Sequence, residues 1–219
     1  MKILITGATG MAGSEAVREA ILDPEIETIT ALVRRPLTIQ HPKLRTVIHN
    51  DYLNYSDLTG LFKEHDACLW CLGISQTVVS KEEYYTITYE YAVAGAKAMA
   101  QANPEMTFLF LSGMGADQTE QRRTLFARVK GKTEKALQVL PFKKFYIARP
   151  GGIAPVREKE KPTLYEMLLA PVYPVLERIF PSYIITSAEL AKAMLSVVKH
   201  GADRTILSNA DLKQVLKTR

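Results

Sequence analysis

The stretch GATGMAG at residues 7–13 constrains the fold of this chain more than any other feature. It follows the apolar run Ile3–Ile5 and opens an amphipathic segment, so the predicted order is strand, glycine turn, helix. In this arrangement an anionic pyrophosphate binds at the helix N-terminus, where backbone N–H groups lack partners and the helix dipole favours negative charge. The alternative is a simple strand-to-helix turn, which does not require three glycines in seven residues.

Each glycine of the stretch has a predicted task. Gly7 permits a tight turn, Gly10 lets the backbone approach the phosphates, and Gly13 lets the helix pack closely against the sheet. We predict that Thr9 and Met11 contact the bound nucleotide together with these glycines. The spacing is GxxGxxG, which differs from the GxGxxG of the common dehydrogenase fingerprint.

Short β-branched runs alternate with longer helical patterns along the rest of the chain. The predicted strands are Lys2–Thr6, Thr28–Val33, Leu44–Ile48, Ala67–Leu72, Thr107–Leu111, Phe145–Ala148 and a short one at Thr205–Leu207. The predicted helices are Gly13–Leu22, Leu58–Glu64, Lys81–Gln101, Thr119–Leu140 and Ala188–Lys199. This alternation predicts an α/β fold, a Rossmann-like doubly wound parallel sheet, formed by a single domain over residues 1–219.

Composition narrows the class of protein. With 47% hydrophobic and 23% charged residues the chain is typical of globular proteins, and no apolar run is long enough for a membrane span. The N-terminus is itself a predicted core strand, which leaves no room for a signal peptide. Two cysteines indicate a reducing compartment, and we expect the cytoplasm. The net charge of +5 comes without a basic stripe, so we expect a small-molecule substrate, no nucleic acid and no stable membrane association.

The region 150–186 differs from the rest because prolines punctuate it. Apolar residues between Leu164 and Phe180 suit two short helices. One interpretation is a small C-terminal helical cap over the substrate side of the cleft. The other is extra core along one sheet edge; contact with a membrane surface is disfavoured because the segment lacks a dense basic face.

The end of the second predicted strand decides the cofactor. An NAD site has Asp or Glu there to bind the ribose hydroxyls, whereas this chain has Arg34-Arg35. Two arginines suit the additional 2′-phosphate of NADP(H), although they are also compatible with a solvated surface pair. Asp51, just past the third strand, is a candidate acceptor for the adenine amino group or, alternatively, a turn residue.

Two further strand ends carry candidate residues, because ligands lie beyond the carboxyl ends of the strands in such sheets. Leu72 and Gly73 end the fourth strand, where glycine lets the chain pass close to a bound ribose. Ser112 ends the fifth strand, near the reacting end of the cofactor. Lys130 falls at the border of the apolar face of the following helix. A ribose hydroxyl pair would satisfy it; the alternative is a lysine that snorkels at the helix edge.

The chain resembles the atypical short-chain dehydrogenase/reductase superfamily. Within it, the chain resembles the small NAD(P)H-binding branch that includes the Tat-interacting tumour-suppressor protein and bacterial proteins described as nucleoside-diphosphate-sugar epimerases. The resemblance covers nearly the whole chain and rests on TGATGMAG, Arg34-Arg35, Asp51-Tyr52-Leu53, Cys71-Leu72-Gly73, Ser112 and Arg149-Pro150-Gly151. It implies a Rossmann fold that binds the cofactor also through Tyr52 and through Pro150, Gly151 and Gly152, which abut the nicotinamide.

The resemblance also implies a catalytic set. In that superfamily a Tyr of a YxxxK motif moves the proton, the Lys binds the nicotinamide ribose, and a Ser holds the substrate oxygen. Ser112 and Lys130 match, but the tyrosine position is Phe126, which transfers no proton. Two ways around this departure are a substitute tyrosine, at residue 84, 85 or 89, and a substrate such as a quinone or flavin that needs none.

These observations favour an NADP(H)-binding oxidoreductase that acts on a small carbonyl or quinone-type substrate. The alternative is a protein that binds NADP(H) without turnover and signals through a partner. A nucleotide-sugar epimerase is less favoured, because that chemistry depends on the missing tyrosine.

The cysteines and histidines of the sequence predict no metal site. Cys68 and Cys71 lie in a predicted strand, where residues three apart point to opposite faces. No second ligand pair accompanies them, so we interpret both as core residues. The four histidines are scattered along the chain and make no metal-binding set.

Overall fold

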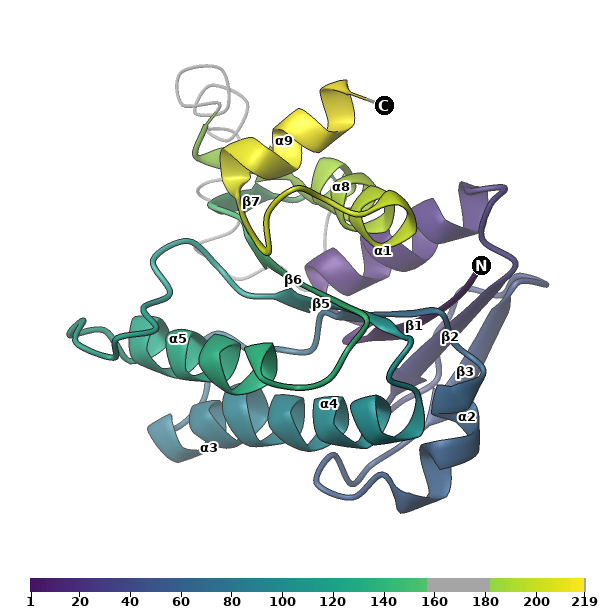
Figure 1. Cartoon of the computed structure of the whole chain (residues 1–219), viewed down its shortest axis with the longest axis horizontal. Helices are drawn as coiled ribbons and strands as arrows, with labels where there is room; N and C mark the ends of the chain where they lie inside the picture. Colours follow the sequence, from purple (N-terminus) through teal and green to yellow (C-terminus); the bar gives the residue numbers. More distant parts are fainter. Residues whose placement is uncertain (157–181, 219) are drawn as a thin grey trace.

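The structure, a computed structural model, describes residues 1–156 and 182–218. Its centre is a seven-stranded parallel sheet of order β3-β2-β1-β4-β5-β6-β9 (Figure 1). The strands are β1 (Lys2–Thr6), β2 (Thr28–Val33), β3 (Leu44–Ile48), β4 (Ala67–Trp70), β5 (Thr107–Leu111), β6 (Lys144–Arg149) and β9 (Ile206–Ser208). The chain starts at β1 in the middle and winds outward first to one side and then to the other, so the predicted Rossmann-like doubly wound sheet is confirmed.

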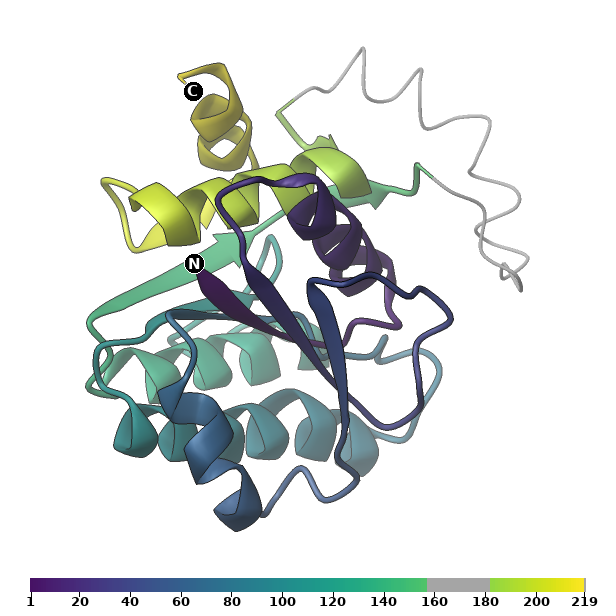
Figure 2. The same cartoon turned by 90° about the vertical axis from the view of Figure 1, so that its right-hand side faces the viewer.

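Helices cover both faces of the sheet (Figures 1 and 2). One layer contains α1 (Met11–Leu22), α8 (Ser187–His200) and α9 (Asn209–Lys217); the other contains α2 (Thr59–Lys63), α4 (Tyr91–Ala102) and α5 (Leu125–Gln138). None of the helices in the described ranges combines the length and the apolar composition that crossing a bilayer requires.

The core forms because the central strands are buried on both faces. Alternate residues of β1 point to opposite layers: Ile3 and Ile5 join the cluster under α1 and α8, and Leu4 joins the cluster over α4. In β5, Phe108 and Leu109 divide in the same way. Such strands appear in the sequence as continuous apolar runs, which is why their bounds could be predicted closely.

Several element bounds differ from the prediction, and two of these differences bear on the site. Strand β4 ends at Trp70 rather than Leu72, because the chain turns at Cys71, whose N–H donates to the Leu69 carbonyl oxygen at 3.1 Å. Cys68 and Cys71 are therefore not both in a strand. They still lie on opposite sides of the sheet, since Cys68 belongs to the α4-side cluster and Cys71 packs against the other.

Helix α5 begins at Leu125 rather than Thr119. The Asp117 carboxylate accepts hydrogen bonds from the Thr119 N–H at 3.0 Å and hydroxyl at 2.7 Å, which holds the preceding residues in a loop. These bonds lower the pKa of Asp117 to about 2. Thr124 then caps the helix, because its hydroxyl accepts from the Ala127 N–H.

The predicted long helix Lys81–Gln101 is divided into three parts. It runs as α3 (Lys81–Tyr85), a π-helical turn η2 (Thr86–Glu90) and α4. The predicted helix near Leu58–Glu64 is likewise a 3₁₀ turn, η1 (Ser56–Leu58), followed by α2.

Within residues 1–156 and 182–218, three elements were not predicted. Strands β7 (Gly152–Ala154) and β8 (Ile184–Thr186) pair in parallel as a separate two-stranded sheet, and α9 follows β9. The β7–β8 pair brings the two ends of the region 150–186 together. The predicted cap between Leu164 and Phe180 lies outside the described residues.

Candidate functional site

The glycine turn after β1 has no room for side chains at two positions. Gly7 has a φ of +66°, and a Cβ there would lie 2.6 Å from the carbonyl carbon of Cys71. A Cβ on Gly13 would lie 2.2 Å from the Gly7 carbonyl oxygen. The turn therefore lies directly against the chain that leaves β4, at the point where the strand order reverses.

The N-terminus of α1 is open to an anion. Its N-cap is Gly10, which offers no side-chain acceptor to the first-turn N–H groups. Thr9 and Gly10 are exposed, and Met11 is half-buried. The shape and the uncapped donors of this turn fit a dinucleotide pyrophosphate, so these residues are the ones that would hold it.

A hollow of about 260 Å³ extends from this turn to the segment that follows β2. Thr9, Arg18 and Leu37 are among its lining residues. Arg34 and Arg35 precede that segment; both are exposed, and neither makes an ion pair or hydrogen bond within the described part of the chain. Two uncommitted arginines thus stand at the end of β2.

The two candidate residues after β3 have different surroundings. Asp51 is exposed, and its carboxylate accepts from the Leu53 N–H at 3.0 Å, as in a turn. Tyr52 is buried, and its hydroxyl donates to the Leu32 carbonyl oxygen at 3.1 Å. The phenol of Tyr52 therefore supports the end of β2 from within the core, which leaves only its backbone for contact with a ligand.

The chain after β4 connects the glycine turn to the lysine of α5. The Leu72 N–H donates to the Thr6 hydroxyl at 3.2 Å, which fixes this segment beside β1. A Cβ on Gly73 would meet the Lys130 Nζ at 3.9 Å and nothing closer. Gly73 and Lys130 thus face each other across an open position.

Lys130 is buried, with 8% of its surface exposed, so it does not snorkel to solvent. Its Nζ donates to the Leu111 carbonyl oxygen at 2.9 Å and lies 4.7 Å from the centre of the Phe110 ring. Burial lowers the pKa of Lys130 to about 8, against the attraction of Glu134. A buried ammonium with donors to spare fits a pair of ribose hydroxyls.

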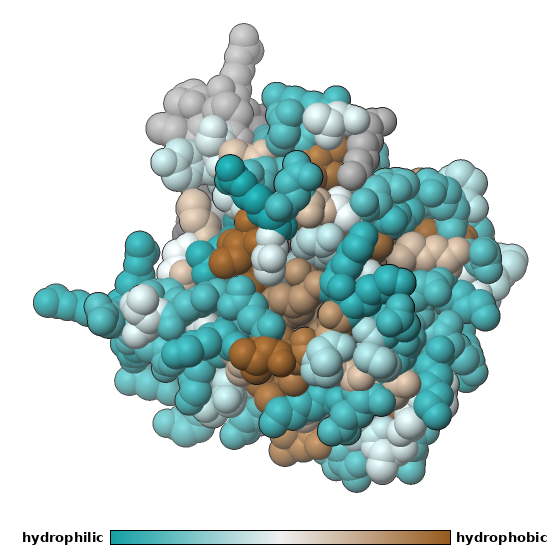
Figure 3. Space-filling model, viewed as in Figure 1, coloured by the Kyte–Doolittle hydropathy of each residue, from teal (hydrophilic) through white to brown (hydrophobic). Residues whose placement is uncertain are grey.

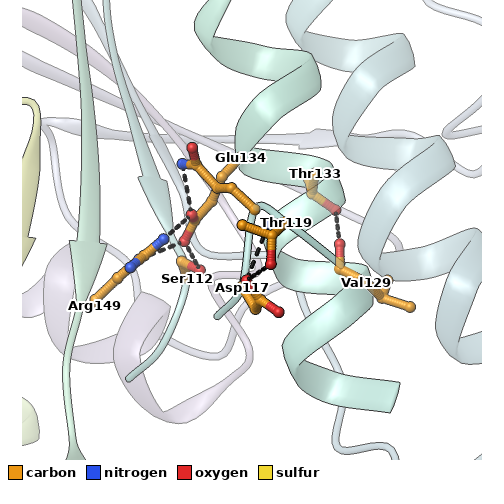
Figure 4. Close-up of polar contacts among 8 residues, drawn as sticks. Ser112, Asp117, Thr119, Val129, Thr133, Glu134 and Arg149 are labelled. Atoms are coloured by element: carbon orange, nitrogen blue, oxygen red, sulfur yellow. Dashed lines mark hydrogen bonds and ion pairs between the residues drawn. The ribbon is translucent and has the colours of Figure 1, made fainter. Parts of the chain in front are cut away.

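Ser112 belongs to a buried polar cluster at the ends of β5 and β6 (Figure 4). Its hydroxyl donates to Glu134 Oε1 at 2.6 Å. Arg149 forms a bidentate ion pair with the same carboxylate, through Nε to Oε1 at 2.9 Å and through Nη2 to Oε2. Gln118 donates to Oε2 at 3.0 Å. Glu134 is fully buried, so this pairing is what compensates its charge.

Phe126, at the position where the resemblance implies a tyrosine, lies beside Gly113, the residue after Ser112. A Cβ on Gly113 would be 2.7 Å from the Phe126 Cζ, so the ring covers the residue next to Ser112. The Phe126 N–H donates to Gln76 Oε1 at 2.9 Å, which ties the start of α5 to the loop after β4. Lys130 follows one helical turn later.

The three substitute tyrosines do not join this group. Tyr84 is buried, and burial raises the pKa of its phenol. The Tyr85 hydroxyl accepts from Lys132 Nζ at 2.8 Å, and the same ammonium lies 4.8 Å from the Tyr89 ring. Lys132 is two residues beyond Lys130 and so points to a different side of α5. It is half-buried against these rings.

The segment after β6 closes the row of strand ends. The Met114 N–H donates to the Pro150 carbonyl oxygen at 2.8 Å, and the Gly151 N–H donates to Asn209 Oδ1 at 3.0 Å. A Cβ on Gly151 would lie 2.0 Å from the Tyr183 carbonyl oxygen, so only glycine fits there. Pro150, Gly151 and the following Gly152 therefore lie next to the loop that carries Ser112.

Burial raises the pKa of both cysteine thiols, that of Cys71 to about 12. Within residues 1–156 and 182–218, no three His, Cys, Asp or Glu side chains gather in a way that could hold a metal ion.

Sequence reasoning missed several polar residues of this site. Glu134 lies four residues after Lys130 and hence on the same side of α5. A carboxylate on the side that carries a candidate site lysine could have been recognised from the sequence as a candidate site residue. Arg149 was noted only as part of the family pattern. Asn209 opens α9, whose capping box between Ser208 and Asp211 was also visible as a helix start.

Comparisons with known proteins agree with this geometry. A family described as NAD(P)H-binding matches residues 7–201. Leucinostatins biosynthesis cluster protein T of Purpureocillium lilacinum is 30% identical over 80% of this chain and 65% of its own length. Protein HTATIP2 of Rattus norvegicus is 25% identical over 73% of this chain and 66% of its own length. The chain thus spans just under two thirds of these two relatives.

A third relative and two solved structures extend the comparison. Protein FMP52, mitochondrial, of Meyerozyma guilliermondii is 27% identical over 89% of this chain and 84% of its own length. Bordetella bronchiseptica WbmF in complex with NAD+ has a TM-score of 0.69 at 11% identity, over 99% of this chain and 77% of that one. UDP-glucuronic acid 4-epimerase from Bacillus cereus has the same TM-score and identity, over 94% and 77%.

The solved structures show the fold alone at such identities, whereas the family match extends from the glycine turn to the end of α8. The chain belongs to the NAD(P)H-binding family of atypical short-chain dehydrogenases/reductases.

Proposed function

We propose that this protein is an NADP(H)-dependent oxidoreductase that acts on a small organic substrate of the carbonyl or quinone type. The observation that carries the proposal is the position of Lys130, which is buried, faces Gly73 and is bonded to the strand end before Ser112. When bound, the nicotinamide would supply the hydride. The chain would supply the orientation: Lys130 for the ribose, the segment 150–152 for the nicotinamide, and Ser112 for the oxygen of the alcohol/carbonyl or hydroquinone/quinone couple.

The preference for NADP(H) is supported by charge at the end of β2. Arg34 and Arg35 are exposed and form no ion pair with the described residues, and the sequence has arginines where an NAD site would have a carboxylate. Arg18, which lines the adjoining hollow, adds a third cation on this side. Guanidinium groups bind phosphate through charge-assisted hydrogen bonds, so a 2′-phosphate is the group that this surface would favour.

Phe126 shapes the substrate range. Its ring covers Gly113 at the place where the family pattern has a proton donor. Loss of a positioned acid typically reduces carbonyl reduction by about 10²–10⁴-fold. Quinones and flavins accept hydride without that tyrosine, so they are the substrates we expect the wild-type protein to reduce fastest.

The test has two stages. Isothermal titration with NADPH and NADH should show tighter binding of NADPH. NADPH oxidation is then followed at 340 nm with matched carbonyl and quinone acceptors, and quinones should give the higher rate. NADH bound as tightly as NADPH would contradict the cofactor assignment, and faster aldehyde than quinone reduction would contradict the substrate assignment.

A second candidate function is binding of NADP(H) without turnover, as a sensor that signals through a partner. Phe126 is the observation that favours it. In that case NADPH binds, every acceptor of the panel leaves it unoxidised, and the oxidised and reduced cofactors differ in affinity. Sugar-nucleotide epimerisation is the weakest candidate, although structural neighbours include an epimerase, because it depends on the same missing tyrosine.

We propose the cytoplasm as the compartment, on the basis of two free cysteines. Relatives named FMP52 are described as mitochondrial. Fractionation of cells of the source organism, with compartment markers, tests the assignment. We further propose that the partner is a small molecule rather than nucleic acid or membrane. We therefore expect that neither a heparin column nor anionic vesicles retain the protein.

A further inference from the structure

The carboxylate of Glu134 has all of its hydrogen-bonding capacity in use. An ionised carboxylate has about four lone-pair sites. Oε1 accepts from Ser112 Oγ at 2.6 Å and from Arg149 Nε at 2.9 Å. Oε2 accepts from Gln118 Nε2 at 3.0 Å and from Arg149 Nη2. Every partner is a donor, and one is a guanidinium, so the arrangement requires the carboxylate to be ionised and leaves it no site for a ligand.

This saturation fixes the direction of the Ser112 hydroxyl. Ser112 has one proton to donate, and the 2.6 Å bond to a buried anion is a strong, charge-assisted hydrogen bond. The described residues make no other hydrogen bond to Ser112 Oγ. Its remaining capacity is two acceptor lone pairs. Toward a ligand, Ser112 is therefore an acceptor and not a donor.

The surroundings of Ser112 keep it in this state. Glu134 is fully buried, so rotation of the serine proton away from it would leave a buried anion with one donor fewer. Ser112 itself keeps 8% exposure at the carboxyl edge of the sheet, between the Phe126 ring on Gly113 and the Lys130 ammonium on Leu111. In Figure 3, the hydrophobic residues of this view gather in the middle, between the two helix layers, and hydrophilic residues surround them.

We propose that Ser112 binds the hydroxyl form of the substrate, an alcohol or a hydroquinone, as a hydrogen-bond acceptor, and that Glu134 is the positioning residue that sets this polarity. The inference rests on the proposed function and deepens it. It assigns the site a preference for the reduced member of an alcohol/carbonyl pair, because a carbonyl oxygen and Ser112 Oγ would both be acceptors.

The test uses two ligands that NADP+ cannot convert. 2-Phenyl-2-propanol donates a hydrogen bond and has no hydride to lose, and acetophenone only accepts. Dissociation constants of both are measured by NMR titration on NADP+-saturated protein. We expect the tertiary alcohol to bind about five- to tenfold more tightly than the ketone. In Ser112→Ala the ratio should fall to about one, and in Ser112→Thr it should persist, since threonine keeps the hydroxyl.

Glu134→Gln tests the positioning role. A neutral amide accepts a weaker hydrogen bond from the serine hydroxyl than a carboxylate does. The ketone should therefore bind more tightly, and the ratio of ketone to alcohol dissociation constants should fall toward one. Thr133→Val is the control for Ser112→Ala, because it too removes a buried hydroxyl. The Thr133 hydroxyl, on the residue of α5 next to Glu134, donates to the Val129 carbonyl oxygen at 2.7 Å and lies away from the Glu134 cluster (Figure 4). Melting temperatures recorded for each variant distinguish a loss of folding from a loss of the alcohol preference. If Glu134→Gln is unstable, Ser112→Ala still tests whether Ser112 causes that preference.

A ketone that binds wild type as tightly as the alcohol would overturn the proposal, as would an alcohol preference that survives Ser112→Ala. Neither result touches the proposed function, which stands or falls with the NADPH titration and the oxidation assay.

Discussion

The two halves of the site are built from different materials. The half around β1, α1 and the end of β4 is made of backbone: glycines that leave no room for a Cβ, and helix N–H groups without a side-chain cap. The half around β5, α5 and β6 is made of side chains: Ser112, Lys130, Glu134 and Arg149, each bonded to a partner. In our proposal the first half binds the cofactor, and the second half determines which reaction the cofactor supports.

The difference has a physical origin. A backbone cradle requires particular φ values and close approaches, and only glycine satisfies them. A side-chain cluster requires only that buried charges be paired, and several residue combinations achieve this. The side-chain half can therefore carry Phe126 where the resemblance implies a tyrosine, while the backbone half keeps its form.

The largest expected effect comes from the cradle. Gly13→Ala would place a Cβ 2.2 Å from the Gly7 carbonyl oxygen, so the turn must shift. We expect NADPH affinity to fall at least about a hundredfold and the free energy of unfolding to fall by about 2 kcal/mol or more. Titration and urea unfolding measure the two.

The matched control is Gly60→Ala, because a Cβ on Gly60, in α2, meets nothing within 4 Å. This variant should bind NADPH as wild type does, and its free energy of unfolding should be about 0.5–1 kcal/mol higher. Equal NADPH affinities for Gly13→Ala and wild type would show that the turn is not the phosphate cradle.

The next effect concerns the cation pair at the end of β2. Arg34→Ala should reduce NADPH affinity about ten- to a hundredfold and leave NADH affinity unchanged, because one charged contact to the 2′-phosphate contributes about 1.5–3 kcal/mol. Arg45→Ala, an exposed arginine of β3, is the control and should change neither value. A parallel loss of both affinities would place Arg34 elsewhere than at the 2′-phosphate.

Phe126→Tyr is the corresponding change in the side-chain half. It would return a proton donor beside Gly113, one turn from Lys130, whose charge lowers the phenol pKa. We expect NADPH-dependent carbonyl reduction to rise at least about tenfold. The double variant Phe126→Tyr/Lys130→Ala should lose the gain, and an unchanged rate in the single variant would mean that another group supplies the proton.

The smallest expected effect concerns the stability of the fold, outside both halves of the site. Buried His65 contacts the Leu61 carbonyl oxygen through Nδ1 and the Thr30 hydroxyl through Nε2, both at 2.8 Å, and burial lowers its pKa. Below the ordinary histidine pKa of about 6.5, the unfolded chain therefore binds more protons than the folded one, and stability should fall as the pH falls. Above that pH this contribution is complete.

Urea unfolding at pH 7.5, 6.5 and 5.5 measures this slope. His65→Gln should be less stable but show a flatter pH dependence than wild type. His200→Gln, at an exposed residue, should follow wild type. Parallel curves for wild type and His65→Gln would exclude His65 as the source.

Predictions from the sequence were most accurate for the strands of the central sheet. The bounds of β1, β2 and β5 were predicted to the residue, because buried parallel strands are continuous apolar runs. The bounds of β3 were also predicted to the residue, although this edge strand is largely exposed. The start of α5 was placed six residues too early, because the loop around Asp117 depends on hydrogen bonds that a helical pattern does not reveal.

The amino-acid sequence alone determined the doubly wound fold, the glycine cradle and the cation pair, because periodicity, glycine spacing and charge at a strand end are local properties. Only the tertiary structure decided that Tyr52 is a core residue and that Ser112 donates its proton to Glu134. Ser112 and Glu134 are 22 residues apart and meet Arg149 through the order of β5, α5 and β6. Their pairing is a property of the packed interior, where a buried carboxylate must find donors wherever the fold brings them.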